Sequence, residues 1–249
     1  MNLASLGVSL EPGILLPAFA AGLLVLASHV PLGQAVLRRG IVFLDLAIAQ
    51  IAGLGVVIAH SLGGEDSPWL TQIGAVAAAL LGALFLYSRE KQAPARQEAI
   101  IGVTFVAAAC AALILMSHDP HGAEHLQDLL VGQILWTTWS GLLPLAMVTL
   151  LMLAAWFGLR WRDSPLGFYV LFALTITASV QVVGIYLVFA SLIVPALVSG
   201  RNLARGFAVG AAGYALGLLA SGLFDLPSGA AIVLALVLVA SLTPRAGSE

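Results

Sequence analysis

The chain has 249 residues, of which 61% are hydrophobic and only 9% are charged, and its mean hydropathy is +1.05. Soluble domains carry roughly 25% charged residues, so this composition excludes a soluble globular protein and predicts an integral membrane protein. The net charge of −2 provides no basic surface for nucleic acid. The single cysteine, Cys110, excludes a disulfide framework and a cysteine metal site.

Long stretches without charged side chains predict the membrane spans. A helix needs about 20 apolar residues to cross the hydrocarbon layer. The stretches are, in chain order, 12–37, 46–64, 67–88, 99–118, 129–159, 164–200, 206–224 and 226–244. The first is expected to be a retained helix, because the residues before it lack the basic region of a signal peptide. The polar loops are too short to fold alone, so residues 1–249 are expected to form one all-α transmembrane domain.

The positions of the charges predict how the chain is threaded through the membrane. Basic residues mark cytoplasmic loops, and here they occur as Arg38/Arg39, Arg89/Lys91/Arg96, Arg160/Arg162, Arg201/Arg205 and Arg245. The stretch 164–200 is too long for one crossing and has basic residues at both ends, so a turn or a broken helix is expected near Gln181 and Gly184. This predicts eight or nine crossings, with the C-terminus in the cytoplasm and, for nine, the N-terminus outside.

Two further patterns predict local packing. Small residues four positions apart allow helices to approach closely, and they occur at Ala18/Gly22, Gly206/Gly210 and Gly213/Gly217. Asp225, just ahead of the last span, is expected to cap the N-terminus of that helix.

The motifs of common enzymes are missing from the sequence. Its one lysine, Lys91, follows the residues SRE rather than a glycine-rich loop, so the chain cannot bind ATP through a P-loop. Neither G-x-S-x-G nor H-E-x-x-H occurs. We therefore do not expect an enzyme acting alone.

The loop HDPHGAEHLQD, residues 118–128, is a candidate for external metal contact. Its imidazoles belong to His118, His121 and His125, and carboxylates lie between them. Imidazole with carboxylate suits zinc and neighbouring first-row metals. The alternative is a solvated external loop without a ligand.

Three segments together resemble the membrane permeases of metal-ion ABC transporters, the zinc, manganese and iron family. They are PLGQAVLRRGIVFLD at 31–45, VQVVGIYLVFASLIVPALVS at 180–199 and DLPSGAAIVL at 225–234. The resemblance implies the fold of a type II ABC importer permease with about eight or nine spans. It also implies an inner-membrane homodimer that contacts lipid, two cytoplasmic ATP-binding subunits and an extracytoplasmic metal-binding protein. It implies no permanently bound cofactor beyond the transported ion.

The resemblance also assigns roles to particular residues. Many members carry Asp-x-x-x-His on the conducting path, and here Asp45 matches the aspartate while Ala49 replaces the histidine and Gln50 follows. Asp45, helped by Gln50 or by the second protomer, is expected to contact the ion. The alternative is a structural ion pair between Asp45 and Arg38 or Arg39. The segment RNLARG, with Arg201, Asn202 and Arg205, falls where the family places a short helix that couples the permease to the ATPase.

The resulting hypothesis is an ATP-driven importer of a divalent metal ion, with zinc first and manganese or iron next. The alternatives are a permease for a metal chelate such as a siderophore or cobalamin, a proton-coupled secondary transporter with Asp45 as the relay, and a membrane scaffold that transports nothing.

Overall fold

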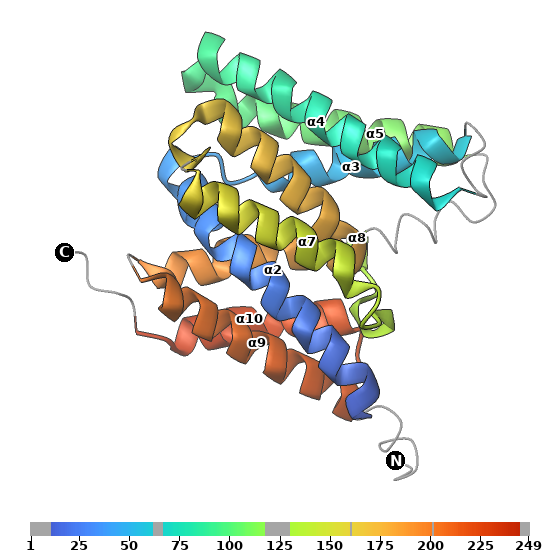
Figure 1. Cartoon of the computed structure of the whole chain (residues 1–249), viewed down its shortest axis with the longest axis vertical. Helices are drawn as coiled ribbons and strands as arrows, with labels where there is room; N and C mark the ends of the chain where they lie inside the picture. Colours follow the sequence, from blue (N-terminus) through green and yellow to red (C-terminus); the bar gives the residue numbers. More distant parts are fainter. Residues whose placement is uncertain (1–10, 62–66, 118–129, 160, 201, 245–249) are drawn as a thin grey trace.

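The computed structural model describes residues 11–61, 67–117, 130–159, 161–200 and 202–244, and all regular elements in these ranges are helices (Figure 1). The all-α prediction is confirmed for this part of the chain. Six helices are long and apolar enough to cross a membrane. The elements are α2 (Pro12–Arg39), α3 (Leu44–Ser61), α4 (Pro68–Gln92), η2 (Pro94–Arg96), α5 (Gln97–Met116), η3 (Ile134–Trp136), α7 (Leu142–Leu153), the π-helix η4 (Ala154–Gly158), η5 (Trp161–Asp163), α8 (Pro165–Ser199), α9 (Leu203–Phe224) and α10 (Ser228–Leu242).

Helix α8 is broken in its middle, as the length of its apolar stretch predicts. Gly184 has φ 77° and ψ 164°, which no helix accommodates and which is essentially restricted to glycine. A straight helix of 35 residues would span about 52 Å, yet both ends of α8 contact the last turns of α2. The Arg39 guanidinium lies 4.3 Å from the centre of the Phe168 ring, and Gln34 Nε2 donates to Ser199 Oγ at 2.8 Å. The two arms of α8 therefore fold back on each other.

Several helix termini meet at the end of the bundle that holds Arg39, which we call the Arg39 end. Arg39 pairs there with Glu90 of α4 at 3.7 Å, and both ends of α8 lie beside the last turns of α2. Arg205 at the start of α9 donates to the Pro244 carbonyl after α10. The basic residues Arg39 and Arg205 thus lie at termini that the topology brings to one end.

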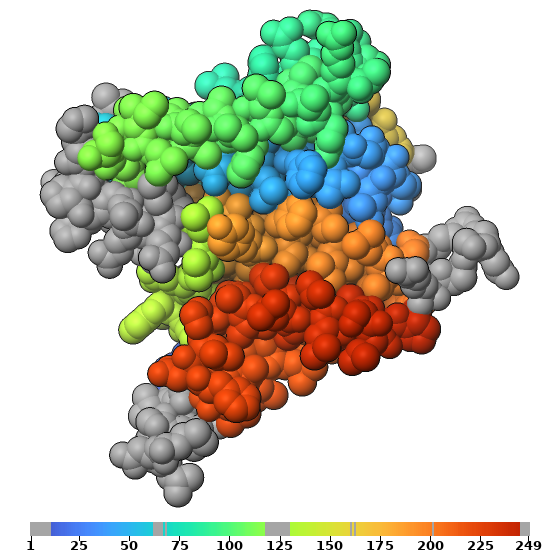
Figure 2. All heavy atoms as spheres, turned by 180° about the vertical axis from the view of Figure 1, so that it is seen from behind, coloured from blue at the N-terminus to red at the C-terminus, as the bar shows by residue number. Residues whose placement is uncertain are grey.

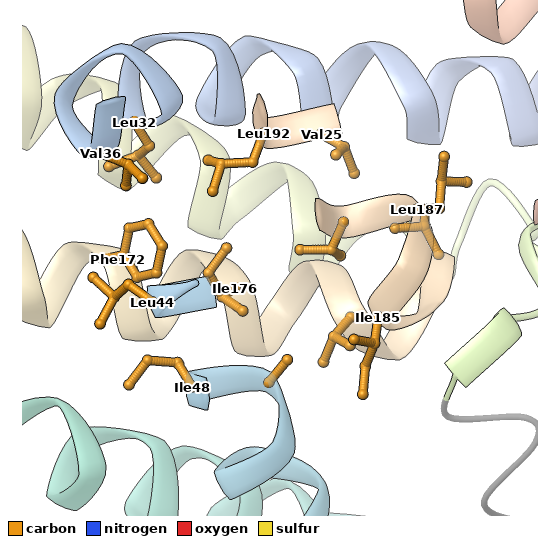
Figure 3. Packing of buried hydrophobic residues seen from close by; sticks show 14 of the residues in the cluster. Val25, Leu32, Val36, Leu44, Ile48, Phe172, Ile176, Ile185, Leu187 and Leu192 are labelled. Carbon is orange, nitrogen blue, oxygen red and sulfur yellow. The ribbon is translucent and has the colours of Figure 1, made fainter. Parts of the chain in front are cut away.

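The core lies where α8 packs between α2 and α3. Leu32 and Val36 of α2 face Phe172 of α8, and Leu44 and Ile48 of α3 face α8 from the other side (Figure 3). Helices α4 and α5 pack against α3, whereas α9 and α10 pack against α8. In Figure 2 the green α5 therefore forms one edge of the molecule and the red α10 lies at the other, with orange α8 between them.

The predicted pairs of small residues do bring helices together. Side chains of α2 fill the space over two glycines of α9, with Val30 at Gly206 and Leu26 at Gly210, and α10 contributes Leu236 at Gly213 and Ile232 at Gly217. In the same way, the Tyr214 ring covers Gly22 of α2. A methyl group at any of these positions would overlap a neighbouring helix, so these glycines set the helix separations.

Two sequence-based expectations need correction. The stretch 129–159 is not helical throughout, because Thr138 Oγ1 accepts a hydrogen bond from Gly141 N at 3.2 Å in a turn before α7 begins. Asp225 does not cap the last helix. It is instead the C-cap of α9 in the left-handed conformation, with φ 52° and ψ 47°, and the residue before α10 is Pro227.

Candidate functional site

The turn between α2 and α3 positions the candidate site. Gly40 ends α2 with φ 68°, a conformation that glycine adopts without steric cost. The chain then turns, and α3 begins at Leu44. Asp45 therefore lies in the first turn of α3, where the partial positive charge of the helix N-terminus favours a carboxylate.

Asp45 is fully buried, and its carboxylate has no hydrogen-bond partner. Its exposed fraction is 0%, and neither Oδ1 nor Oδ2 makes a hydrogen bond. The backbone N–H groups of Asp45 and Leu46 lie near the carboxylate without reaching hydrogen-bond geometry. An unpaired carboxylate inside a membrane costs about 2.5–3.5 kcal/mol and usually marks function. Asp45 therefore faces the interior of the helix bundle.

The alternative role of Asp45, an ion pair with an arginine, is wrong for this structure. Arg39 pairs with Glu90 at 3.7 Å and stacks on Phe168, and the side chain of Arg38 is exposed. The physical reason is the break at Gly40, which ends the helix before Asp45 and separates the arginines from it.

A second carboxylate approaches the same turn from α5. Glu98 Oε1 accepts a hydrogen bond from Phe43 N at 3.2 Å, immediately before α3 begins. Its other oxygen, Oε2, is buried without a partner. Sequence reasoning missed Glu98 because it stands beside Arg96 in a charged segment and looked like an ordinary loop residue. The signal available was its position in the first turn of an apolar helix.

The two residues that follow Asp45 in the family pattern occupy different faces of α3. Ala49 lies one turn after Asp45 on the same face and is buried. Gln50 is five residues from Asp45 and therefore about 140° around the helix from it, with a half-buried side chain. The predicted help of Gln50 to Asp45 stays a prediction.

Other unpartnered polar atoms are buried in the described core. His29 of α2 binds the Val25 carbonyl through Nδ1 at 2.9 Å, but its Nε2 has no partner. The first arm of α8 contributes three further hydroxyl groups without partners, those of Thr175, Thr177 and Ser179. Buried polar groups without partners are therefore present on α2 and α8 as well as at Asp45 of α3.

Of the remaining predicted site residues, the structure describes only Asn202 and Arg205. His118, His121 and His125 lie outside the described residues, as does Arg201. Within the segment expected to form a short separate helix, residues 203–206 form the first turn of α9, because the Asn202 side chain accepts from Ala204 N at 3.0 Å and caps that helix. Arg205 donates to the Pro244 carbonyl. The roles of these residues stay predictions.

Comparison with known proteins identifies the family. The family model described as the ABC 3 transport family matches residues 12–166 and 153–243. No curated protein matches. Among solved structures, PsaBC from Streptococcus pneumoniae in complex with Fab has a TM-score of 0.71 at 22% identity, covering 97% of this chain and 95% of that one.

A second similar structure is described as an inward-facing conformation of a metal-chelate type ABC transporter. Its TM-score is 0.67 at 15% identity, and the match covers 92% of this chain and 82% of that one. At these identities the two structures show a shared fold. Because the family model covers nearly all of the described residues, the chain belongs to the ABC 3 transport family and is a multi-pass membrane transport subunit of the metal-type ABC permeases.

Proposed function

We propose that the chain forms the translocation path of an ATP-driven importer for a divalent transition-metal ion, and that Asp45 contacts the ion directly. The observation that carries this proposal is the fully buried, unpartnered carboxylate of Asp45 in a chain of this permease family. Zinc, manganese and iron are the candidate ions. The path would form in a homodimer, with ATP hydrolysed by separate cytoplasmic subunits and the ion delivered by an extracytoplasmic protein.

The topology supports an importer permease whose Arg39 end faces the cytoplasm. If the two arms of α8 count separately, the apolar helices run alternately toward and away from the Arg39 end, and α10 finishes there at Pro244. With the Arg39 end placed in the cytoplasm, we infer nine crossings from this order, with an external N-terminus and a cytoplasmic C-terminus. Basic residues at cytoplasmic termini follow the general rule for membrane proteins.

The physical argument for Asp45 is that a site on a transport path must bind the ion and then release it. One carboxylate can replace part of the hydration shell of an ion, whereas a closed cage of strong ligands would retain the ion. A metal-chelate permease would need space for a much larger substrate at this position. Asp45 is instead enclosed by packed helices, which favours a bare ion.

The test is Asp45→Asn in the complete transporter, assayed for uptake of zinc, manganese and iron in proteoliposomes. The substitution removes the charge and keeps the size, so we expect normal insertion and assembly with at least a tenfold loss of uptake. Asp163→Asn, at the end of the 3₁₀ helix η5, is a matched control that should leave uptake unchanged. A stable Asp45→Asn transporter with full activity would reject the proposal.

A further inference from the structure

An apolar groove opens between α2, η4 and the start of α9. Its volume is about 200 Å³, and every side chain that lines it is apolar. Leu26, Val30 and Pro31 of α2 are buried beneath it, whereas Phe157 of η4 and Ala204 of α9 are exposed beside it. In Figure 1, α2 lies between α9 and the helix α7 that continues into η4. The groove therefore joins three elements at the surface of the bundle.

The packing of α2 against α9 forms this groove before any ligand binds. Val30 fills the space over Gly206, and Leu26 fills the space over Gly210, so the side chains that hold the two helices together also line the groove. A cavity of about 150 Å³ with apolar walls stays dry and takes up benzene. The groove is large enough for an apolar group of that size and offers no side chain that could bind water.

A free basic side chain lies on the same face of α2. Arg38 is seven residues after Pro31 and eleven after Ala27, which are net rotations of only about 20° on a helix, so the three share one stripe. Arg38 is exposed, and within the described ranges its guanidinium has no ion pair or hydrogen bond. Arg39 and Arg205, by contrast, both have partners. The groove thus leads along α2 to an uncompensated positive charge.

The length of this path matches one leaflet of a membrane. Twelve residues separate Leu26 from Arg38, about 18 Å at 1.5 Å per residue, and the hydrocarbon of one leaflet is about 15 Å thick. A lipid with its phosphate at the level of Arg38 would therefore lay an acyl chain along the groove. A peptide would instead bring backbone polar groups, which these apolar walls cannot pair.

We propose that the groove and Arg38 together bind one anionic phospholipid of the cytoplasmic leaflet, with an acyl chain in the groove and the phosphate on the guanidinium. Arginine pairs with phosphate through two parallel N–H···O bonds, and basic pockets between membrane helices bind anionic head groups. The choice of leaflet rests on the orientation in the proposed function, whereas the lipid site is independent of the metal. The lipid would hold the first turn of α9, and with it the α8–α9 connection, against α2.

The first experiment measures lipid binding to the purified full-length protein by native mass spectrometry. The protein is titrated with palmitoyl-oleoyl phosphatidylglycerol and, separately, with phosphatidylcholine that has the same chains. We expect one phosphatidylglycerol per chain, bound about fivefold more tightly than phosphatidylcholine, because one arginine near an anionic lipid contributes roughly 1 kcal/mol. Arg38→Gln should remove this preference. Arg96→Gln, which changes another exposed arginine beside the start of α5, is the matched control and should keep it.

A second set of variants tests the groove itself. Ala204→Trp places a bulky ring beside the groove at an exposed position and should weaken the binding of both lipids at least tenfold. Ala212→Trp adds the same side chain at an exposed position about two turns further along α9 and should bind like the wild type. Phe157→Ala removes an exposed aromatic wall without adding bulk, and it should also weaken both lipids. Thermal unfolding in detergent checks that each variant is folded.

The outcomes separate the two parts of the proposal. Equal affinity of the wild type for both lipids, or an unchanged preference in Arg38→Gln, would overturn the assignment of the phosphate to Arg38. Wild-type lipid binding by both Ala204→Trp and Phe157→Ala would overturn the groove as an acyl-chain site and leave it for a protein partner. These measurements involve no metal, so failure of the lipid site would leave the proposed function intact, and failure of metal uptake would leave the lipid site intact.

Discussion

At the scale of single residues, Asp45 and Glu98 differ in how visible they are in the sequence. Asp45 could be predicted because a lone carboxylate in an apolar run demands an explanation. Glu98 follows Arg96 and Gln97 at the edge of a span, where charges are common. Its contact with the start of α3 joins residues 55 positions apart, and no local pattern encodes it.

The buried pair of Ser191 and Tyr214 gives a prediction about stability. Their hydroxyl oxygens are 2.8 Å apart, and both side chains have an exposed fraction of 0%. Tyr214→Phe removes this hydrogen bond between α8 and α9 and keeps the ring that covers Gly22. We expect a loss of about 1 kcal/mol in the free energy of unfolding, measured by titration with sodium dodecyl sulfate.

A double-variant cycle is the control for this prediction. If the hydrogen bond is the cause, Ser191→Ala combined with Tyr214→Phe should destabilise the protein by less than the sum of the two single changes. Strictly additive effects would show that the two hydroxyls do not stabilise each other.

At the scale of elements, the sequence predicts the long helices well and the irregular segments poorly. Charge-free stretches locate α2, α3, α4 and α5 to within a few residues at most ends, because both length and polarity limit a membrane span. The segment 130–141 carries no charged residue, so the charge-free stretches do not reveal its turn. The turn just before α7 is formed by a local hydrogen bond from Gly141 N to Thr138 Oγ1, and hydropathy does not measure such bonds.

The break in α8 gives a prediction at this scale. A methyl group at Gly184 would lie 2.3 Å from Gly132 N and 2.5 Å from the Val131 carbonyl carbon. The backbone conformation of Gly184 is also almost restricted to glycine, with a cost of roughly 1–3 kcal/mol for other residues. Gly184→Ala should therefore destabilise the protein by about 3 kcal/mol or more, or abolish folded expression. Thermal unfolding of the purified protein in detergent measures this loss.

Gly102→Ala is the matched control for the break. Gly102 is inside α5, and nothing lies within 4 Å of the position of an added methyl group. Alanine favours a helix over glycine by roughly 0.5–1 kcal/mol, so this variant should be neutral or slightly more stable. A Gly184→Ala protein as stable as Gly102→Ala would contradict the account of a backbone-to-backbone contact at the break.

At the scale of the whole molecule, the distribution of charges predicts the membrane topology but not which helices pack together. The basic clusters in the sequence correctly predict that α8 returns to the side where it begins, because both of its ends meet the last turns of α2. The sequence does not reveal that α3 packs with α4 and α5 while α2 packs with α8 and α9. The grouping of the helices depends on how the shapes of many side chains and glycines fit together. An analysis of one span at a time does not include these contacts between spans.

The connection between α8 and α9 is where we expect the permease to transmit movement to its ATPase. Asn202 caps α9, Gln34 of α2 holds the end of α8, and Arg205 reaches the end of α10. A force on this connection would therefore reach α2 and α10 as well as α8 and α9. Replacing both Arg201 and Arg205 with Glu should reverse the local charge and weaken ATPase contact, so that ATP hydrolysis continues without metal uptake in proteoliposomes.

Arg205 also has a role inside the chain, so the coupling prediction needs two controls. Arg205→Gln removes the charge but can still donate to the Pro244 carbonyl, and it should preserve folding with at most a partial loss of coupling. Arg96→Glu reverses an exposed charge beside the start of α5, away from the α8–α9 connection, and should leave transport coupled. If coupling depends only on positive charge near the membrane, Arg96→Glu will impair it as much as the double variant does. If the α8–α9 connection is the docking element, only the double variant will separate ATP hydrolysis from uptake, and coupled transport by a well-expressed double variant would contradict the assignment.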